Sequence, residues 1–443
     1  INTTVCSISQ FSVTPNASNG VVPSGTTYSW DIPTYENGSL SGGQSRNGQS
    51  NIFGTITNPT NTRYYARYFV VPTTGVCIGA TFVVNAFINP IPVITPMSTV
   101  VCSGDPFSIT PVHNVNGSVP VSSNMFYSWN NRVVSDPLLT GTGSGNSSLG
   151  GFFTGALTNG TNTQQTATYQ VTPIYSADGV NCAGTPFTAT IFVNAKAVIN
   201  LITTTICSGA PFTVSPANFT NGIVPAGTRY KWLTPVQTSS LTGGESSTLL
   251  KNDITDLLFN SASVIQTATY TVTPNTLLCG DNNPFTLVVT VYPRPAIDAM
   301  TTVTCSGIQF VVSPADILNG RVPGNNTYSW DPPSVTSGLS GGQSNSGQSF
   351  ISGTLNNSLN VAQTATYIIT PTSLYNCVGA SFTLTVTVNP GGFVNAMTTA
   401  TCSGVMFNVT PVNGTNGVVP DNTKYTWSAP TYTGTISGGT PSS

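Results

Sequence analysis

Charge is scarce in this sequence. Of its 443 residues, 11 are Lys or Arg, 13 are Asp or Glu, and one, His113, is a histidine. Charged side chains make up 5% of the chain, against about 25% in an average soluble domain. Because a nucleic-acid-binding face needs a dense array of basic side chains, we expect no nucleic acid among the partners. A single histidine also excludes a repeated catalytic triad or a repeated zinc site.

Long apolar runs and helical periodicity are missing too. No stretch of 18 apolar residues occurs, so the sequence predicts no membrane span. The string LSGGQ appears at 40–44 and 339–343, but no phosphate-binding loop of the form G-x-x-x-x-G-K-[ST] accompanies it. Acidic residues do not recur at a spacing that would hold calcium. We therefore expect no catalytic residues, no cofactor and no metal.

What the chain does contain is a repeat of about 100 residues. The phrase "TTVCSISQFSVTP" at 3–15 returns, with changes, at 98–111, 203–216, 301–314 and 398–411. The last copy stops halfway, so the chain is either a slice of a longer array or is completed by another chain. The predicted domains are repeats at 1–90, 91–195, 196–293 and 294–390, and the first half of a fifth repeat at 391–443.

Each repeat has the pattern of a β-sandwich. In the fourth repeat, the segments at 309–314, 327–330, 365–371 and 382–390 are short, rich in β-branched and aromatic residues, and bounded by Pro, Gly, Asn or Ser. About seven such strands per repeat, with a Cys…Trp…Cys frame, predict an all-β chain of tandem immunoglobulin-like domains. The expected core residues are Trp30, Trp129, Trp232, Trp330 and Trp427, with Tyr68, Tyr169, Tyr270 and Tyr367 at the tyrosine-corner position.

Nine cysteines at regular spacing indicate a disulfide framework, and hence an oxidising, extracytoplasmic compartment. Pairing within repeats would join Cys6–Cys77, Cys102–Cys182, Cys207–Cys279 and Cys305–Cys377, and would leave Cys402 unpaired. These points can lie at opposite ends of a sandwich. The alternative joins neighbours across a joint: Cys77–Cys102, Cys182–Cys207, Cys279–Cys305 and Cys377–Cys402. The intervening strand would then separate the two cysteines by roughly 25–30 Å.

The joints between repeats lie at 89–97, 194–202, 292–300 and 389–397. They are short, partly apolar and in two cases rich in Pro, unlike a flexible Gly/Ser linker. The spacing of the cysteines that flank each joint is nearly constant at about 25 residues. We therefore expect one fixed joint geometry and an extended rod on the order of 170 Å long.

The phrases "CSG-x-x-F-x-V-T-P", "Y-S-W", "Q-T-A-T-Y-x-V-T-P" and "F-T-x-T-V-x-V-N-P" resemble the PKD-like repeats of giant surface proteins of the Bacteroidetes. Some of those proteins are type IX secretion substrates and gliding-motility adhesins. The charged "W-D-F-G-D-G" signature of other PKD domains is absent. The resemblance implies an exported, extracellular protein of the bacterial cell surface, which is either attached to the outer membrane or part of a filament, and it names no ligand.

These observations favour a non-catalytic stalk or filament segment of a secreted adhesin, which supplies reach and mechanical stability. Its partners would be surface polymers or neighbouring cells, with self-association possible. Two other hypotheses remain. The repeats could form a glycan- or surface-binding module, or the chain could be an extracellular fibre subunit whose half repeat is completed by strand exchange.

Overall fold

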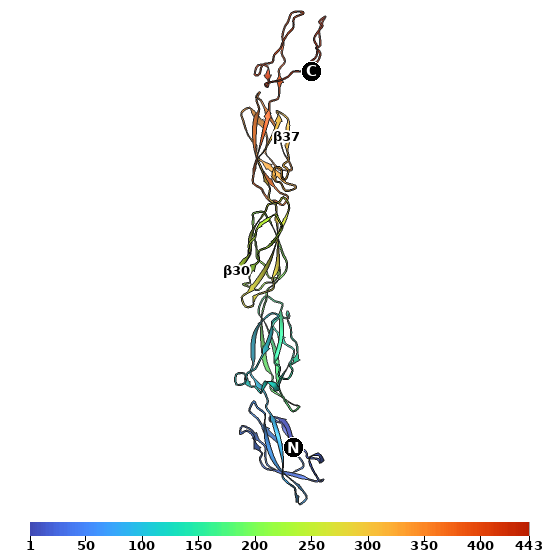
Figure 1. The fold of residues 1–443 in the computed structure, drawn as a ribbon, viewed down its shortest axis with the longest axis vertical. Coiled ribbons are helices and arrows are strands. Elements are labelled where there is room, and N and C mark those ends of the chain that lie inside the picture. The colour runs from blue at the N-terminus through green and yellow to red at the C-terminus, as the bar shows by residue number, and fades with distance from the viewer. Residues whose placement is uncertain (443) are drawn as a thin grey trace. The chain divides into compact units, whose positions relative to one another are not determined.

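The structure is a computed structural model that describes residues 1–442. Over these residues it consists of β-strands and loops, and its only helical segments are two 3₁₀ turns, η1 (Ala17–Asn19) and η2 (Ser122–Asn124) (Figure 1). No helical segment in the described part of the chain has the length and apolarity of a membrane span. The all-β prediction is confirmed.

The first repeat folds into two sheets that face each other. A larger sheet has the order β1-β10-β8-β3-β6, with β4 and β9 added along β8, and a smaller sheet has the order β2-β7-β5. In the larger sheet, β1 runs parallel to β10, whereas β10 and β8 are antiparallel. The strands are β1 (Asn2–Cys6), β2 (Gln10–Val13), β3 (Thr27–Trp30), β4 (Thr34–Tyr35), β5 (Ser41–Gly42), β6 (Arg46–Gln49), β7 (Ile52–Thr57), β8 (Tyr64–Thr74), β9 (Cys77–Ile78) and β10 (Phe82–Asn89).

The second repeat has the same topology, with sheets β12-β22-β20-β15-β18 and β13-β19-β17. A two-residue strand in the joint, β11, precedes it and pairs with β14. The strands are β11 (Val93–Ile94), β12 (Met97–Cys102), β13 (Pro106–Ile109), β14 (Gly117–Ser118), β15 (Met125–Trp129), β16 (Val133–Val134), β17 (Leu139–Gly141), β18 (Gly145–Asn146), β19 (Phe153–Asn159), β20 (Gln165–Ala177), β21 (Val180–Ala183) and β22 (Phe187–Asn194).

The third repeat again has a five-strand path, β24-β34-β32-β27-β30, and a smaller sheet, β25-β31-β29. Its strands are β23 (Val198–Ile199), β24 (Ile202–Cys207), β25 (Pro211–Val214), β26 (Gly222–Ile223), β27 (Arg229–Trp232), β28 (Val236–Gln237), β29 (Leu241–Gly243), β30 (Ser247–Lys251), β31 (Ile254–Asn260), β32 (Gln266–Thr276), β33 (Gly280–Asp281) and β34 (Phe285–Tyr292).

The fourth repeat has the sheets β36-β45-β44-β39-β42 and β37-β43-β41. After it, residues 391–442 form only the short pair β46–β47 and an isolated bridge between Trp427 and Ser442. The strands are β35 (Ala296–Ile297), β36 (Met300–Cys305), β37 (Gln309–Val312), β38 (Gly320–Arg321), β39 (Thr327–Trp330), β40 (Ser334–Val335), β41 (Leu339–Gly341), β42 (Asn345–Gln348), β43 (Ile351–Asn357), β44 (Gln363–Thr372), β45 (Phe382–Asn389), β46 (Phe393–Val394) and β47 (Gly417–Val418).

Alternation along the strands creates the core of each sandwich. In β45, every second side chain is buried, from Phe382 through Leu384 and Val386 to Val388. The opposite face of the strand carries threonine. Aromatic rings join the two layers, as where Phe310 of β37 meets Tyr367 of β44 with ring centroids 5.6 Å apart. This apolar interior is the main source of stability for a sandwich of this size.

By its internal contacts the chain divides into two compact units. The first comprises 1–200, 216–229 and 273–284, and the second comprises 201–215, 230–272 and 285–443. The first unit thus contains the first two repeats and, from the third, β23, β26, β33 and the end of β32. The second unit contains the strands of the fourth repeat and most of those of the third. The predicted repeat boundaries are used below only to name parts of the chain.

Candidate functional site

The expected core residues lie in the sandwiches, with one exception. The four tyrosines are fully buried, and Trp30, Trp232 and Trp330 are at most 6% exposed. Trp129 is half-buried and packs against the core of the second repeat. The expectation for Trp427 is wrong, because its side chain is 56% exposed. No sheet covers it, since β46 and β47 are the only strands that pair within residues 391–442.

The Leu40–Gln44 motif has a structural role around the tryptophan. The Trp30 indole N–H donates to the backbone oxygen of Gln44 at 2.9 Å. Gly43 has a φ of 75°, and a Cβ there would lie 2.8 Å from the Tyr68 hydroxyl, so only glycine fits. The indoles of the other four tryptophans make the same bond, to the carbonyls of Gly143, Glu245, Gln343 and Thr440.

The tyrosines keep their protons to high pH because they are buried. Burial raises the pKa of Tyr367 to about 12. Burial also raises the pKa of Tyr270, and the Asp256 carboxylate, which accepts a hydrogen bond from its hydroxyl at 3.0 Å, adds to the effect.

A buried asparagine, which the sequence analysis missed, closes the corner of each complete repeat. The Asn260 side-chain amide donates to the carbonyls of Val264 (2.8 Å) and Val291 (3.1 Å), and its oxygen accepts from the N–H of Ala262 (2.9 Å). Its backbone N–H donates to the hydroxyl of Ser208 (2.8 Å). The sequence does contain a signal for this asparagine, because in each complete repeat it stands ten residues before the buried tyrosine. The four pairs are Ser7 and Asn58, Ser103 and Asn159, Ser208 and Asn260, and Ser306 and Asn357.

The disulfides follow neither of the pairings that the spacing allowed. The structure joins Cys6 to Cys182, Cys102 to Cys279 and Cys207 to Cys377, with Cα–Cα distances of 5.5, 5.8 and 5.6 Å. Each bond therefore links the first cysteine of one repeat to the second cysteine of the next. Cys77 and Cys305, which were expected in disulfides, are free and exposed, as is Cys402.

Strand direction explains this correction. Cys6 ends β1, where it lies in register with Asn89 at the end of β10. We call this the outgoing end of the repeat, because the chain leaves it for the next joint. Cys77 lies in β9, which pairs with the end of β8 and precedes β10. We call this the incoming end. The length of β10 separates the two cysteines of one repeat, whereas the outgoing end of one repeat meets the incoming end of the next.

Each disulfide closes a very long loop. The sequence separation is 176 residues for Cys6–Cys182, 177 for Cys102–Cys279 and 170 for Cys207–Cys377. On the chain-entropy model, a loop of this length stabilises the folded state by about 5 kcal/mol. The three loops overlap along the chain, so no repeat between Cys6 and Cys377 lies outside them.

Polar contacts surround the first of these disulfides. Asp178, in the second repeat, accepts a hydrogen bond from Thr4 and forms an ion pair with Arg63, both in the first repeat. The Thr4 hydroxyl and the Arg63 guanidinium hold the pKa of the Asp178 carboxyl below its usual value. The guanidinium carbon of Arg63 also lies 4.4 Å from the centre of the Phe87 ring. The same arginine thus contacts both repeats.

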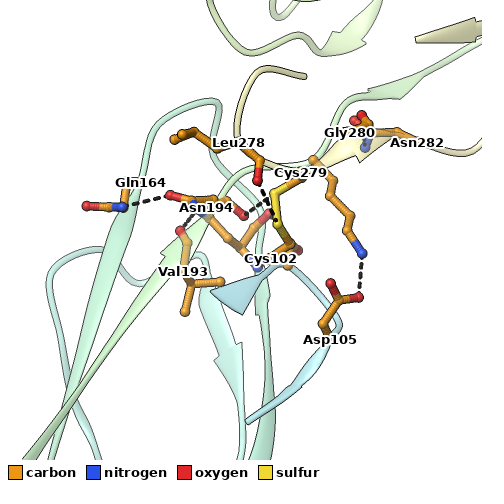
Figure 2. Close-up of a disulfide and its surroundings, with 12 residues drawn as sticks. Cys102, Asp105, Gln164, Val193, Asn194, Leu278, Cys279, Gly280 and Asn282 are labelled. Carbon is orange, nitrogen blue, oxygen red and sulfur yellow. Dashed lines mark hydrogen bonds and ion pairs between the residues drawn. A yellow bond between two sulfur atoms is a disulfide. The ribbon is translucent and has the colours of Figure 1, made fainter. Parts of the chain in front are cut away.

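Figure 2 shows the second disulfide, in which Cys102 at the end of β12 meets Cys279 on the turn before β33. Beside it, Gln164 donates to the side chain of Asn194 at 2.7 Å. The Asn282 side-chain oxygen accepts from the backbone N–H of Ala197, a joint residue, at 2.7 Å. The sulfur bridge therefore lies within a hydrogen-bonded contact.

Beside the third disulfide lies a stacked pair of aromatic rings. The rings of Tyr292 and Tyr375 lie parallel, with centroids 4.0 Å apart. Tyr292 is the partner of Cys207 in the parallel register of β24 and β34. Tyr375 stands two residues before Cys377. The Ser263 hydroxyl also donates to Asp316 at 2.5 Å, and this bond is the main reason why the pKa of Asp316 is lowered.

A short strand in every joint completes the contact. In the first joint, β11 pairs with β14, and the N–H of Thr95 donates to the carbonyl of Asn116 at 2.9 Å. A Cβ on Gly117 would lie only 2.2 Å from the oxygen of Val93, so the strand can approach only glycine. The pairs β23–β26, β35–β38 and β46–β47 repeat this, each on an Asn-Gly of the following repeat.

The PKD-like domain family matches residues 99–197, 204–295 and 302–392, which together make up more than half of the chain. The chain belongs to the PKD-like domain family. No curated protein matches it. Among residues 1–442, no group of three or more His, Cys, Asp or Glu side chains is arranged to hold a metal.

Solved structures that are similar to the chain have low identity and low TM-scores. The insect immune protein hemolin is 11% identical, over 88% of this chain and 97% of that one, with a TM-score of 0.22. The N-terminal four immunoglobulin domains of Dscam1 isoform 1.9 are 8% identical, over 88% and 96%, with a TM-score of 0.20. An endo-fucoidan hydrolase of glycoside hydrolase family 107 is 12% identical, over 67% of this chain and only 43% of its own, with a TM-score of 0.20.

Proposed function

We propose that this chain is a non-catalytic extracellular spacer, a stalk or filament segment of a surface adhesin, in which disulfides between successive PKD-like repeats resist tension. The observation that carries the proposal is the staggered pairing of Cys6–Cys182, Cys102–Cys279 and Cys207–Cys377. Disulfides and tandem PKD-like repeats are features of proteins outside the cytoplasm. The bacterial surface and the export route remain part of the proposal.

The staggered bonds create two covalent routes along the chain. One route runs through residues 1–6, crosses to 182–207, and crosses again to 377–443. The other runs through 1–102 and crosses to 279–443. The first route bypasses residues 7–181 and 208–376, and hence most of each of the four complete repeats. A pulling force is therefore carried by sulfur bridges and by short segments at the joints, and the sandwiches can lose structure without much lengthening of the chain.

A low charge density suits such a spacer. The ion pairs Arg63–Asp178 and Lys196–Asp105 are both partly exposed. Salt screens exposed pairs of this kind, and each contributes little to stability. Cohesion of the joints therefore depends on backbone pairing, disulfides and apolar contact, which ionic strength hardly alters.

Single-molecule stretching between the two termini tests the proposal. The shorter covalent route contains roughly 100 residues, so the oxidised chain is expected to extend to about 330 Å and no further. The fully reduced chain is expected to reach about 1,500 Å and to show separate unfolding events for the repeats. A variant with Cys77, Cys305 and Cys402 all changed to Ser is the control, and it is expected to behave as the oxidised parent.

Pairing within repeats would leave about 150 residues between the termini, and hence an oxidised limit of about 500 Å. That result would contradict the staggered arrangement. An oxidised chain that lengthens as far as the reduced one would overturn the mechanical proposal altogether.

A further inference from the structure

The incoming end of the first repeat contains a cavity of about 580 Å³. Its lining brings together Val22 and Pro23 from the loop before β3, Cys77 and Ile78 of β9, and Phe82 of β10. The side chain of Ile78 is 76% exposed, and the Cys77 thiol is exposed and free. The cavity is therefore lined both by apolar side chains and by a free thiol.

The valines equivalent to Val22 in the second, third and fourth repeats are covered by the preceding joint. Val22 is half-buried, but its equivalents Val119, Val224 and Val322 are at most 9% exposed. Cys77 is exposed, whereas Cys182 and Cys377 are at most 1% exposed and bonded. The cavity therefore has the chemistry of a surface that, elsewhere in this chain, receives the preceding repeat.

The backbone beside the cavity includes a segment that resembles the strand-pairing segments of the later repeats. Asn19-Gly20-Val21-Val22-Pro23 matches the Asn-Gly-x-Val-Pro segment that pairs with a joint strand in each of the later repeats. Gly20 has a φ of 132°, and a Cβ there would have nothing within 4 Å. At the four equivalent glycines, a carbonyl oxygen of the joint lies 2.2–2.4 Å from that Cβ position. Those glycines are Gly117, Gly222, Gly320 and Gly417.

We propose that the incoming end of the first repeat is a docking site for the outgoing end of a further PKD-like repeat. The joint strand of that repeat pairs with Gly20–Val21, and the cysteine of its CSG phrase forms a disulfide with Cys77. We refer to the cavity and Cys77 together as the receptor site. The proposal rests on the geometry of the joints and does not depend on the mechanical function.

A second copy of this chain is a poorer occupant. Each of its four joint strands is already paired with the following Asn-Gly segment. The joint strand that follows the fourth repeat, where Cys305 is free, is β46. A second copy could present this strand only by breaking the β46–β47 pair. The partner is therefore a PKD-like repeat whose joint strand has no Asn-Gly segment of its own to bind.

The covalent step balances as thiol–disulfide exchange. The partner cysteine first exchanges with a small disulfide, such as oxidised glutathione, which gives a mixed disulfide and releases one small thiol. The Cys77 thiolate then attacks the sulfur of the partner cysteine in this mixed disulfide. The new S–S bond forms as the small thiolate leaves and takes up a proton. Over both exchange steps, the two cysteine thiols lose two electrons and two protons, and one small disulfide is reduced to two thiols.

The direct test places a second copy of residues 202–299 immediately before Ile1 of the full chain. This junction keeps the joint register, because Ile1 stands five residues before Cys6 just as Met300 stands five before Cys305. In a glutathione redox buffer, peptide mapping is expected to find Cys77 bonded to Cys207 of the added copy, beside the three disulfides of the parent. A free Cys77 in a chain that forms those three disulfides would overturn the proposal.

Gly20→Ala in the extended chain is expected to weaken the Cys77 bond tenfold or more, measured against glutathione. The matched control is Gly25→Ala, where φ is 80° and nothing lies within 4 Å of the added Cβ. The control is expected to change the equilibrium by less than twofold. Equal effects of the two substitutions would contradict strand pairing at Gly20.

A measurement on the unextended chain does not depend on folding of the added copy. A synthetic peptide of residues 292–299, at millimolar concentration, is expected to slow alkylation of Cys77 several-fold and to leave Cys402 unaffected. No slowing would overturn the proposal. Covalent oligomers that form through Cys77 of the unextended chain would do so as well, because they identify a second copy as the occupant.

Discussion

At the scale of single residues, the corner asparagine is a buried polar side chain that holds each sandwich together by its hydrogen bonds. Asn357 is 5% exposed, and its amide donates to the carbonyls of Val361 and Val388 at 2.8 and 2.9 Å. Asn357→Ala leaves these buried groups without partners, and each such group costs about 1–3 kcal/mol. We expect the fourth repeat to lose at least that amount of stability, measured by hydrogen exchange of residues 351–390.

The neighbouring Asn356 provides the control, because its side chain is exposed. Asn356→Ala is expected to change the free energy of unfolding by less than about 0.5 kcal/mol. If the two substitutions had the same effect, the corner would not be a source of stability.

Buried tyrosines predict how stability depends on pH. Burial raises the pKa of Tyr127, Tyr230 and Tyr367 to about 12, with a further contribution from Asp253 at Tyr230. An unfolded tyrosine titrates near 10, so the unfolded state loses its protons first and gains stability as the pH rises above that value. We expect the melting temperature to hold through neutral pH and to fall steeply between about pH 10 and 12.

Tyr367→Phe removes one of these phenols and is expected to make the alkaline fall less steep. Tyr432→Phe, at an exposed position, is the control and is expected to leave the slope as it is. A melting temperature that is flat to pH 12 would contradict the burial of the tyrosines.

At the scale of elements, the joint strand β35 depends on a glycine in β38. A Cβ on Gly320 would lie 2.4 Å from the carbonyl oxygen of Ala296, so Gly320→Ala is expected to separate the two strands. The amide of Asp298, which donates to the carbonyl of Asn319 at 3.0 Å, reports the separation. We expect its hydrogen exchange to become about tenfold faster or more.

Gly347→Ala is the matched control, because Gly347 also has a positive φ, 65°, but nothing within 4 Å of the Cβ position. The strain of a left-handed alanine is then common to both variants. Exchange at Asp298 that responds equally to the two substitutions would show that the joint does not need glycine.

The strands themselves were predictable because the alternation of apolar and polar residues along a strand is a local feature of the sequence. The expected segments at 309–314, 327–330, 365–371 and 382–390 correspond to β37, β39, β44 and β45. The joint strands were not predictable in this way. Two residues are too few to show alternation, and β35 pairs only because the chain returns to it at Gly320, more than 20 residues later. The buried Asn357 was missed because asparagine is usually an exposed turn residue.

At the scale of the whole chain, the cysteine pairing was the main error of the sequence analysis. Spacing along the sequence favours partners within one repeat or on either side of one joint. The observed partners, such as Cys6 and Cys182, are separated by 176 residues. They meet because the parallel pairing of β1 with β10 places Cys6 at the outgoing end, and hairpin β20–β21 places Cys182 at the incoming end of the next repeat.

Peptide mapping of the unreduced 443-residue chain tests this arrangement most directly. Digestion and mass spectrometry are expected to recover three linked peptides, containing Cys6 with Cys182, Cys102 with Cys279, and Cys207 with Cys377, and to find Cys77, Cys305 and Cys402 as thiols. Linked peptides that contain Cys102 with Cys182, or Cys182 with Cys207, would contradict the account.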